Sequence, residues 1–253
     1  MARGPRKKSK SQIYHIMLRG INKQIVFNEN VDYEKFLKVM RRCKVKSEYQ
    51  VYAYCLMENH LHLLLKEGKE PLEIAMKRIC CSYVYWYNLK YQRVGNLFQD
   101  RFKSEPVEDD KYFITVLRYI HQNPVKAGIE KEISSFKWCS YCDYLGISDL
   151  TDTEYVLSLF NKDRKKSIEL FVTYINEDCS YKELEVEKKQ KTNDIEAKKI
   201  IENICNFTNP YIMQTLGASE RDIFLKKIKQ NGISGRQIER LTGISRGTVA
   251  RLQ

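Results

Sequence analysis

The chain of 253 residues has 43% hydrophobic and 30% charged side chains, a composition typical of one or two water-soluble domains. The longest uninterrupted apolar run, from Val51 to Met57, is far too short to span a bilayer, so we do not expect this chain to be a membrane protein. The chain starts with basic residues instead of an apolar export signal, which indicates a cytoplasmic location.

The net charge of +12 is concentrated at the two ends of the sequence. Residues 1–10 carry five basic and no acidic side chains, and residues 221–253 carry eight basic and two acidic ones. Residues 11–220 are close to neutral. This distribution favours attachment to a polyanion such as nucleic acid. The alternative is a solubilising tail together with a solvated helix face.

Eight cysteines without an export signal indicate reduced thiols in a cytosol. The single CxxC motif, Cys139 to Cys142, lacks a second pair at the spacing of a zinc site. We therefore expect small buried hydrophobic side chains here, not a zinc knuckle.

Strands and helices alternate in the first 145 residues. Segments rich in β-branched and aromatic residues predict strands at 12–18, 50–57 and 60–65, with a short extended piece at 105–107. Apolar residues at helical spacing predict helices at 32–46, 71–91 and 111–123, the last one opened by Asp109-Asp110 and closed by Pro124. This order predicts an α+β fold, a sheet with helices packed on it.

Two of the four histidines lie in the third predicted strand. Because side chains alternate between the faces of a strand, His60 and His62 project to one side and Leu61, Leu63 and Leu65 to the other. Two neighbouring imidazoles on a stiff sheet form a pair of metal ligands. Two exposed histidines on a solvated face are the alternative.

A second group of polar residues lies on the predicted helix at 111–123. Tyr119 and Asn123 stand four residues apart and are neighbours on one helix surface. A phenol and an amide beside a metal site indicate a nucleophile and a third ligand. A tyrosine that covers the core and an asparagine that ends the helix are the alternative, and periodicity leaves Tyr112 on nearly the same face as Tyr119.

The last part of the chain predicts a helix-turn-helix. Two short helices, 234–241 and 245–252, flank Thr242-Gly243-Ile244, where Gly243 suits a left-handed turn position. Ser245 is a good N-cap, and the second helix would expose Ser245, Arg246, Thr248 and Arg251 to DNA. Glu239 stands where such motifs usually have a small residue. A plain helical hairpin for dimer contacts is the alternative.

Four ordered segments together resemble the HUH single-strand transposases with one catalytic tyrosine, and among them the REP-associated tyrosine transposases. These segments are YHIMLRG (14–20), AYCLMENHLHLLL (53–65), GNLFQDRFKSEPVEDD (95–110) and RYIHQNPVKAG (118–128). The resemblance implies a ferredoxin-like antiparallel sheet, Tyr119 as the nucleophile, and His60, His62 and Asn123 as metal ligands. The chain departs from the family pattern at Glu58, where the family usually has proline.

The resemblance also implies the activity: cleavage and rejoining of single-stranded DNA through a covalent 5′-phosphotyrosine, with recognition of hairpin ends and action as a homodimer. Mixed nitrogen and oxygen ligands favour Mg²⁺ or Mn²⁺ as the cofactor. A DNA-binding regulator without activity and a metal-dependent hydrolytic nuclease are the alternatives. Further DNA-binding candidates in the N-terminal part are Arg3, Arg6, Lys7, Lys8, Arg101 and Lys103.

The expected domain organisation has four parts. A basic arm covers residues 1–11 and the transposase catalytic domain covers 12–148. A helical extension with a charged linker, most charged at 181–191, covers 149–193. An all-α helix-turn-helix domain covers 194–253.

Overall fold

The computed structural model describes residues 6–146, 150–177, 194–207 and 209–251. The chain divides into two compact units, Met1–Leu184 and Glu185–Gln253, and each is described by itself. Within the described residues, no helix combines the length and apolar character needed to cross a membrane.

The first unit is built on a four-stranded antiparallel sheet in the order β2-β3-β1-β4. Its strands are β1 (Ile13–Arg19), β2 (Gln50–Met57), β3 (His60–Lys66) and β4 (Lys103–Pro106). Helix α1 (Asn30–Ser47) connects β1 to β2, and helix α2 (Leu72–Lys90) connects β3 to β4. The sequence of elements and the strand order confirm the ferredoxin-like α+β fold, and most boundaries agree with the predicted ones within two residues.

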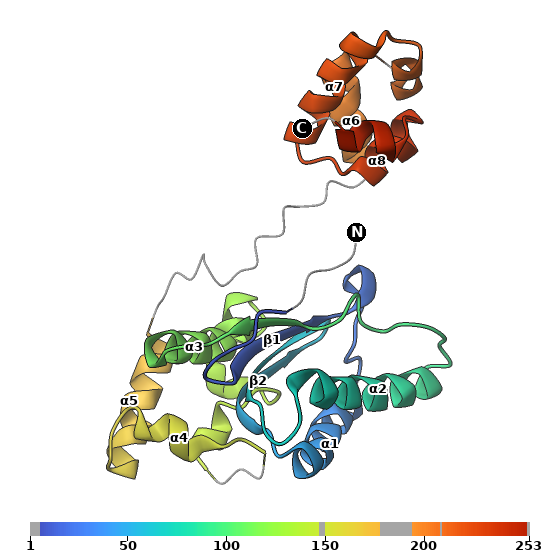
Figure 1. The fold of residues 1–253 in the computed structure, drawn as a ribbon. Coiled ribbons are helices and arrows are strands. Elements are labelled where there is room, and N and C mark those ends of the chain that lie inside the picture. The colour runs from blue at the N-terminus through green and yellow to red at the C-terminus, as the bar shows by residue number, and fades with distance from the viewer. Residues whose placement is uncertain (1–5, 147–149, 178–193, 208, 252–253) are drawn as a thin grey trace. The chain divides into compact units, whose positions relative to one another are not determined.

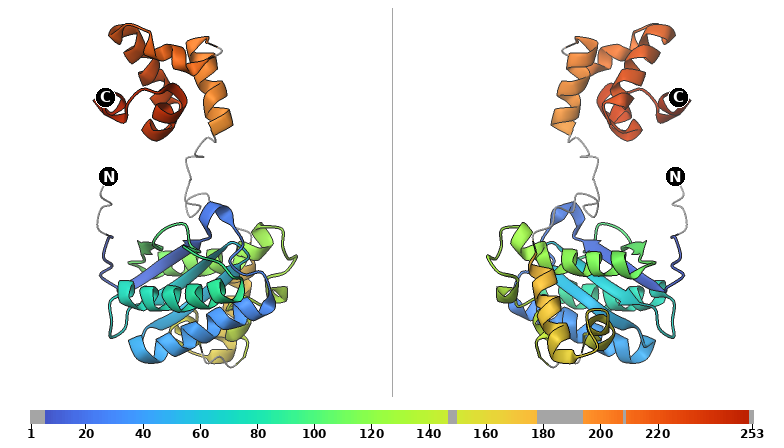
Figure 2. Two further views of the ribbon diagram at one scale, coloured as in Figure 1. Left: turned by 90° about the vertical axis from the view of Figure 1, so that its right-hand side faces the viewer. Right: turned by 90° about the vertical axis from the view of Figure 1, so that its left-hand side faces the viewer.

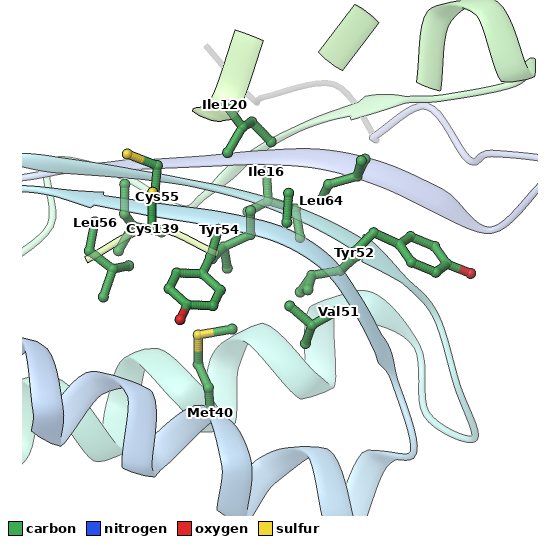
Figure 3. Packing of buried hydrophobic residues seen from close by; sticks show 14 of the residues in the cluster. Ile16, Met40, Val51, Tyr52, Tyr54, Cys55, Leu56, Leu64, Ile120 and Cys139 are labelled. Atoms are coloured by element: carbon green, nitrogen blue, oxygen red, sulfur yellow. The ribbon is translucent and has the colours of Figure 1, made fainter. Parts of the chain in front are cut away.

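The two faces of the sheet are covered by different helices. Helices α1 and α2 lie on one face, and α3 (Asp110–Lys126) lies on the other (Figures 1 and 2). The close view shows Met40 of α1 and Ile120 of α3 on opposite sides of the sheet, with Tyr54 on the side of Met40 (Figure 3). Both layers bury large apolar side chains, which makes the sheet a rigid support for groups on the α3 face.

Helix α3 begins as predicted but ends later. Asp109 is its N-cap and accepts a hydrogen bond from the Tyr112 amide at 2.8 Å. The prediction that Pro124 closes the helix is wrong, because the helix continues to Lys126 with Pro124 inside it. Proline fits the last turn since it removes a single ladder bond there, and the Ala127 amide still reaches the Asn123 carbonyl at 2.9 Å.

Two further helices complete the first unit. They are α4 (Thr153–Ser158) and α5 (Arg164–Asn176). Phe171 of α5 is fully buried and stacks on Tyr144 with ring centroids 4.3 Å apart. The described part of the predicted extension therefore packs on the sheet unit, while residues 178–193, which hold the charged linker, lie outside the described residues. The boundaries expected at 148 and 193 stay a prediction.

The second unit is helical. It contains α6 (Asp194–Cys205), α7 (Ala218–Gln230), α8 (Gly235–Thr242) and α9 (Arg246–Arg251). Ser234 caps α8 through the Gln237 amide, and Gly243 ends it with a φ of 73°, the left-handed conformation that the sequence predicts. Ile238, Ile244 and Val249 are buried in a core of their own. Helices α8 and α9 with the turn between them have the form of a helix-turn-helix.

Short 3₁₀ turns link these elements in both units. They cover Ile21–Lys23, Ile133–Ser135, Cys142–Tyr144 and Pro210–Gln214.

Candidate active site

His60 and His62 share the face of the sheet that α3 covers. In the antiparallel register His60 lies opposite Arg19, and His62 lies opposite Met17 of β1. The two rings stand 5.3 Å apart at 86°. His60 Nδ1 lies 2.7 Å from the Asn59 side-chain oxygen, so it donates a proton there and leaves Nε2 with a lone pair. The pairing that alternation predicts is present.

His15 of β1 is the third histidine of this site, and the sequence analysis missed it. Its ring is fully buried, and its Nε2 lies 3.1 Å from His62 Nδ1. Burial lowers the pKa of His15 to about 4, and burial with the neighbouring His15 and His60 lowers the pKa of His62 well below its usual value. Both rings are therefore neutral at pH 7, as a metal ligand and its neighbour must be.

Tyr119 enters the same place from α3. Its ring centroid lies 5.4 Å from that of His62 and 5.8 Å from that of His15, with an edge-to-face arrangement in both cases. Tyr112, which periodicity could not exclude, instead donates a hydrogen bond to Glu105 at 3.4 Å. The structure thus brings Tyr119, not Tyr112, against the histidine pair.

Asn123 lies one turn after Tyr119 on α3 and is half-buried. Its side-chain nitrogen donates to the Tyr119 carbonyl at 2.7 Å, which leaves the side-chain oxygen as the atom that can coordinate a metal ion. Two imidazoles and one amide oxygen form a donor set whose chemistry suits Mg²⁺ or Mn²⁺. The residues present are therefore chemically suited to hold the expected ion.

Arg19 is a second residue that the sequence analysis missed. It lies beside His60 across β1 and β3, and its Nε is buried with no hydrogen-bond partner among the described residues. A guanidinium on the histidine face adds positive charge where a phosphate would approach. The sequence gives no local signal for Arg19, because this residue follows directly after the strand predicted at 12–18.

The basic candidates of the first unit lie in different surroundings. Lys103 on the edge strand β4 lies opposite Met17 and thus shares the histidine face, and Arg101 just before it is exposed. Arg6 packs its guanidinium 3.8 Å from the centroid of the Phe102 ring. With Lys7 and Lys8 it lines a pocket of about 400 Å³, to which Glu67, Glu70 and Glu73 also contribute. Arg3 lies outside the described residues.

The candidates of the second unit lie on α9 or directly before it, with Arg251 at its end. Ser245, Arg246 and Arg251 are exposed and Thr248 is half-buried. The Ser245 hydroxyl accepts from the Thr248 amide at 3.3 Å, the expected N-cap contact. Glu239, the unusual residue of the motif, accepts from the Arg246 amide at 3.2 Å and pairs with its guanidinium at 2.9 Å. The carboxylate thus occupies the space at the helix start.

The two cysteines of the CxxC motif lie in different environments. Cys139 is buried and donates to the Phe136 carbonyl, whereas Cys142 is exposed and donates to the Ser134 carbonyl. Burial raises the pKa of Cys139 to about 12, so this thiol stays protonated.

His121 lies on α3 but away from the site, and its burial leads us to expect that the stability of the first unit depends on pH. It is fully buried, its Nε2 lies 2.8 Å from the Ser140 hydroxyl, and burial lowers its pKa to about 3. Below pH 6.5 the unfolded chain binds a proton that the folded chain does not, so the free energy of unfolding falls as the pH falls from 6.5 towards 3.

In His121→Gln, we expect the slope of the free energy of unfolding against pH to be smaller by up to about 1.4 kcal/mol per pH unit. Urea unfolding followed by tryptophan fluorescence measures it, because both tryptophans, Trp86 and Trp138, lie in the first unit. An unchanged dependence between pH 6.5 and 4.5 would contradict the assignment.

Comparisons with known proteins find matches among family models, curated proteins and solved structures. Residues 8–123 match the family model of IS200-like transposases. A curated protein of Haemophilus influenzae, provisionally assigned as a REP-associated tyrosine transposase, is 24% identical over 104 residues, which cover 37% of this chain. The chain spans 59% of the length of that relative.

A solved structure shows the same fold. A REP-associated tyrosine transposase bound to a REP hairpin superposes with a TM-score of 0.51 and 18% identity, over 57% of this chain and 86% of that one. A provisionally assigned transposase from Deinococcus radiodurans superposes with a TM-score of 0.34 and 16% identity, over 48% of this chain and 97% of that one. Residues 8–123, with a histidine pair and the α3 tyrosine in a ferredoxin-like unit, are thus similar to the IS200-like transposases, and this unit shares the fold of a REP-associated tyrosine transposase.

Proposed function

We propose that the first unit cleaves and rejoins single-stranded DNA with Tyr119 as the nucleophile. The observation that carries this proposal is the contact of the Tyr119 ring with His62, which itself lies beside His60. A phenol that a helix fixes beside one potential metal ligand, with a second one next to it, has the arrangement that covalent attack on a phosphate needs.

His60 and His62, each through Nε2, and Asn123, through its side-chain oxygen, would hold the metal ion. A bound Mg²⁺ or Mn²⁺ polarises a non-bridging phosphate oxygen and makes the phosphorus more electrophilic. The protein's own part is to keep His62 neutral through burial and to fix the orientation of both imidazole rings through their hydrogen bonds.

The reaction conserves the number of phosphate ester bonds. The Tyr119 oxygen gives up its proton and forms a bond to phosphorus, while the bond from phosphorus to the 3′ oxygen breaks and that oxygen takes up a proton. The products are a 5′-phosphotyrosine and a free 3′ hydroxyl. Because the new ester has an energy similar to the old one, a 3′ hydroxyl from another DNA end can reverse the step and join strands without ATP.

Hairpin DNA is the substrate class we propose, since a related protein has been solved on a REP hairpin. Arg19 and Lys103 on the histidine face carry the positive charge that would meet the phosphates next to the cleaved bond.

We also propose that the chain acts as a homodimer, which light scattering of the full chain at several concentrations would test.

The full chain incubated with Mn²⁺ and hairpin oligonucleotides that carry single-stranded flanks tests the proposal. We expect a protein–DNA adduct on a denaturing gel, and we expect none when EDTA is present during the incubation. Mass mapping of the adduct should place a nucleotide on Tyr119. Cleavage without an adduct would indicate a hydrolytic nuclease, and binding without cleavage a regulator. Either result would overturn the proposed transposase chemistry.

The second unit is proposed to bind duplex DNA through α9. Replacing Arg251 with alanine is expected to weaken duplex binding and to lower the slope of log affinity against log salt by about 1, the value for one phosphate contact. Lys199→Ala is the matched control, because Lys199 is equally basic and exposed but lies on α6. Equal losses for the two variants, measured by fluorescence anisotropy, would contradict a role for α9.

A further inference from the structure

Three groups from three elements stand in a row behind the proposed metal site. His62 Nδ1 lies 3.1 Å from His15 Nε2, and the other ring nitrogen, His15 Nδ1, lies 3.9 Å from a carboxylate oxygen of Glu105 on β4. The His15 ring is fully buried between them. In the sheet, His15 lies directly opposite Glu105, so their positions follow from the β1–β4 register.

The contact between the two imidazoles permits two arrangements of protons. In the first, His62 Nδ1 donates to His15 Nε2, and His62 Nε2 keeps its lone pair. In the second, His15 Nε2 donates to His62 Nδ1, and the proton of neutral His62 sits on Nε2, where it blocks metal binding. The site is therefore competent in the first arrangement alone.

The charge next to His15 distinguishes the two arrangements. His15 Nδ1 is buried without a hydrogen-bond partner among the described residues, and the charged group that lies near it is the Glu105 carboxylate. In the first arrangement this nitrogen carries a proton, whose positive end faces the carboxylate. In the second it presents a lone pair to a negative charge 3.9 Å away, which is unfavourable because the His15 ring is fully buried, even though the Glu105 side chain is 41% exposed.

We propose that Glu105, acting through His15, holds His62 in the tautomer that offers Nε2 to the metal. Both are positioning residues: neither contacts the DNA or the ion, and both act on the orientation of one ligand. This inference rests on the proposed metal site and adds to it the residues that set the ligand's proton.

The first test uses the metal-free protein. Long-range ¹⁵N–¹H spectra of the ring nitrogens distinguish the two tautomers of each of the four histidines in the full chain. We expect His62 to carry its proton on Nδ1, and His15 likewise. A His62 ring with its proton on Nε2 in the wild-type chain would overturn the proposal.

The second test measures Mn²⁺ affinity by calorimetry in variants of His15. His15→Leu removes the acceptor for His62 and is expected to weaken Mn²⁺ binding by at least about tenfold, as for other residues behind a metal ligand. His15→Gln can accept with its amide oxygen and donate with its amide nitrogen, and it should restore most of the affinity. His121→Leu is the matched control, because it removes an equally buried histidine away from the site.

A folded His15→Leu variant with wild-type affinity, or equal losses in the Leu and Gln variants, would contradict the proposal. If His15→Leu does not fold, Glu105→Gln serves in its place, since it removes the charge and keeps the shape. It is expected to weaken Mn²⁺ binding several-fold and to raise the population of the second His62 tautomer. Glu108→Gln, a nearby carboxylate that accepts from the Lys10 and Ser11 amides, should change neither.

These outcomes are separable from those of the proposed function. If Tyr119 forms the DNA adduct but the His15 and Glu105 variants bind Mn²⁺ like wild type, the positioning role alone is wrong. If no adduct forms while the tautomer and affinity results hold, the transposase chemistry alone is wrong.

Discussion

Tyr119→Phe is expected to lower the yield of covalent protein–DNA adduct by at least about a thousandfold, because no other phenol is placed to replace the lost nucleophile. The described part of the site holds one tyrosine ring against the histidines, that of Tyr119. The variant removes one oxygen and keeps the ring that packs on His15 and His62, so DNA binding should persist. Radiolabelled oligonucleotide on a denaturing gel measures the adduct, and anisotropy measures binding.

Tyr112→Phe is the matched control for this experiment. It removes the same atom from the same helix but loses only the long hydrogen bond to Glu105, so the adduct should form close to the wild-type level. An adduct that survives in Tyr119→Phe and disappears in Tyr112→Phe would reverse the assignment of the nucleophile.

Phe171→Ala is expected to lower the free energy of unfolding of the first unit by about 3–5 kcal/mol. The Phe171 ring is fully buried on α5 and lies among the rings of Tyr144, Tyr141 and His121. Its loss leaves a cavity between α5 and the sheet unit that rigid neighbours cannot fill. Urea titration with tryptophan fluorescence measures the change in the unit that contains both tryptophans.

Leu170→Ala on the same helix is the control, and it should change the free energy of unfolding by no more than about 0.5 kcal/mol, because Leu170 is 39% exposed. If Phe171→Ala and Leu170→Ala have equally small effects, α5 is not part of the cooperative core. The predicted division of the chain after residue 148 would then describe its folding better than the packing does.

Local patterns were sufficient for the sheet and for half of the site. Alternation in a strand determines that His60 and His62 share a face, whatever packs on it, and helical periodicity determines that Tyr119 and Asn123 are neighbours. Neither pattern relates the strand to the helix. The choice between Tyr119 and Tyr112 depended on where α3 crosses the sheet, which is a property of the tertiary packing.

His15 was missed because its role depends on strand order. A single histidine in an apolar strand gives no local signal. His15 is placed next to His62 and Glu105 only because β1 pairs with β3 on one side and with β4 on the other. Glu239 was noted as unusual, but its contact with Arg246 is a contact between helices that no spacing rule contains. Pro124 misled because a proline inside a helix removes one backbone hydrogen bond but does not always end the helix.

The position of β1 has a consequence for synthesis of the protein. The first strand of the chain lies inside the sheet, between β3 and β4, so it lacks both of its neighbours until the ribosome has made residues up to Pro106. The histidines and the tyrosine come from β1, β3 and α3, which extends to Lys126. A product that terminates early would therefore lack a complete centre.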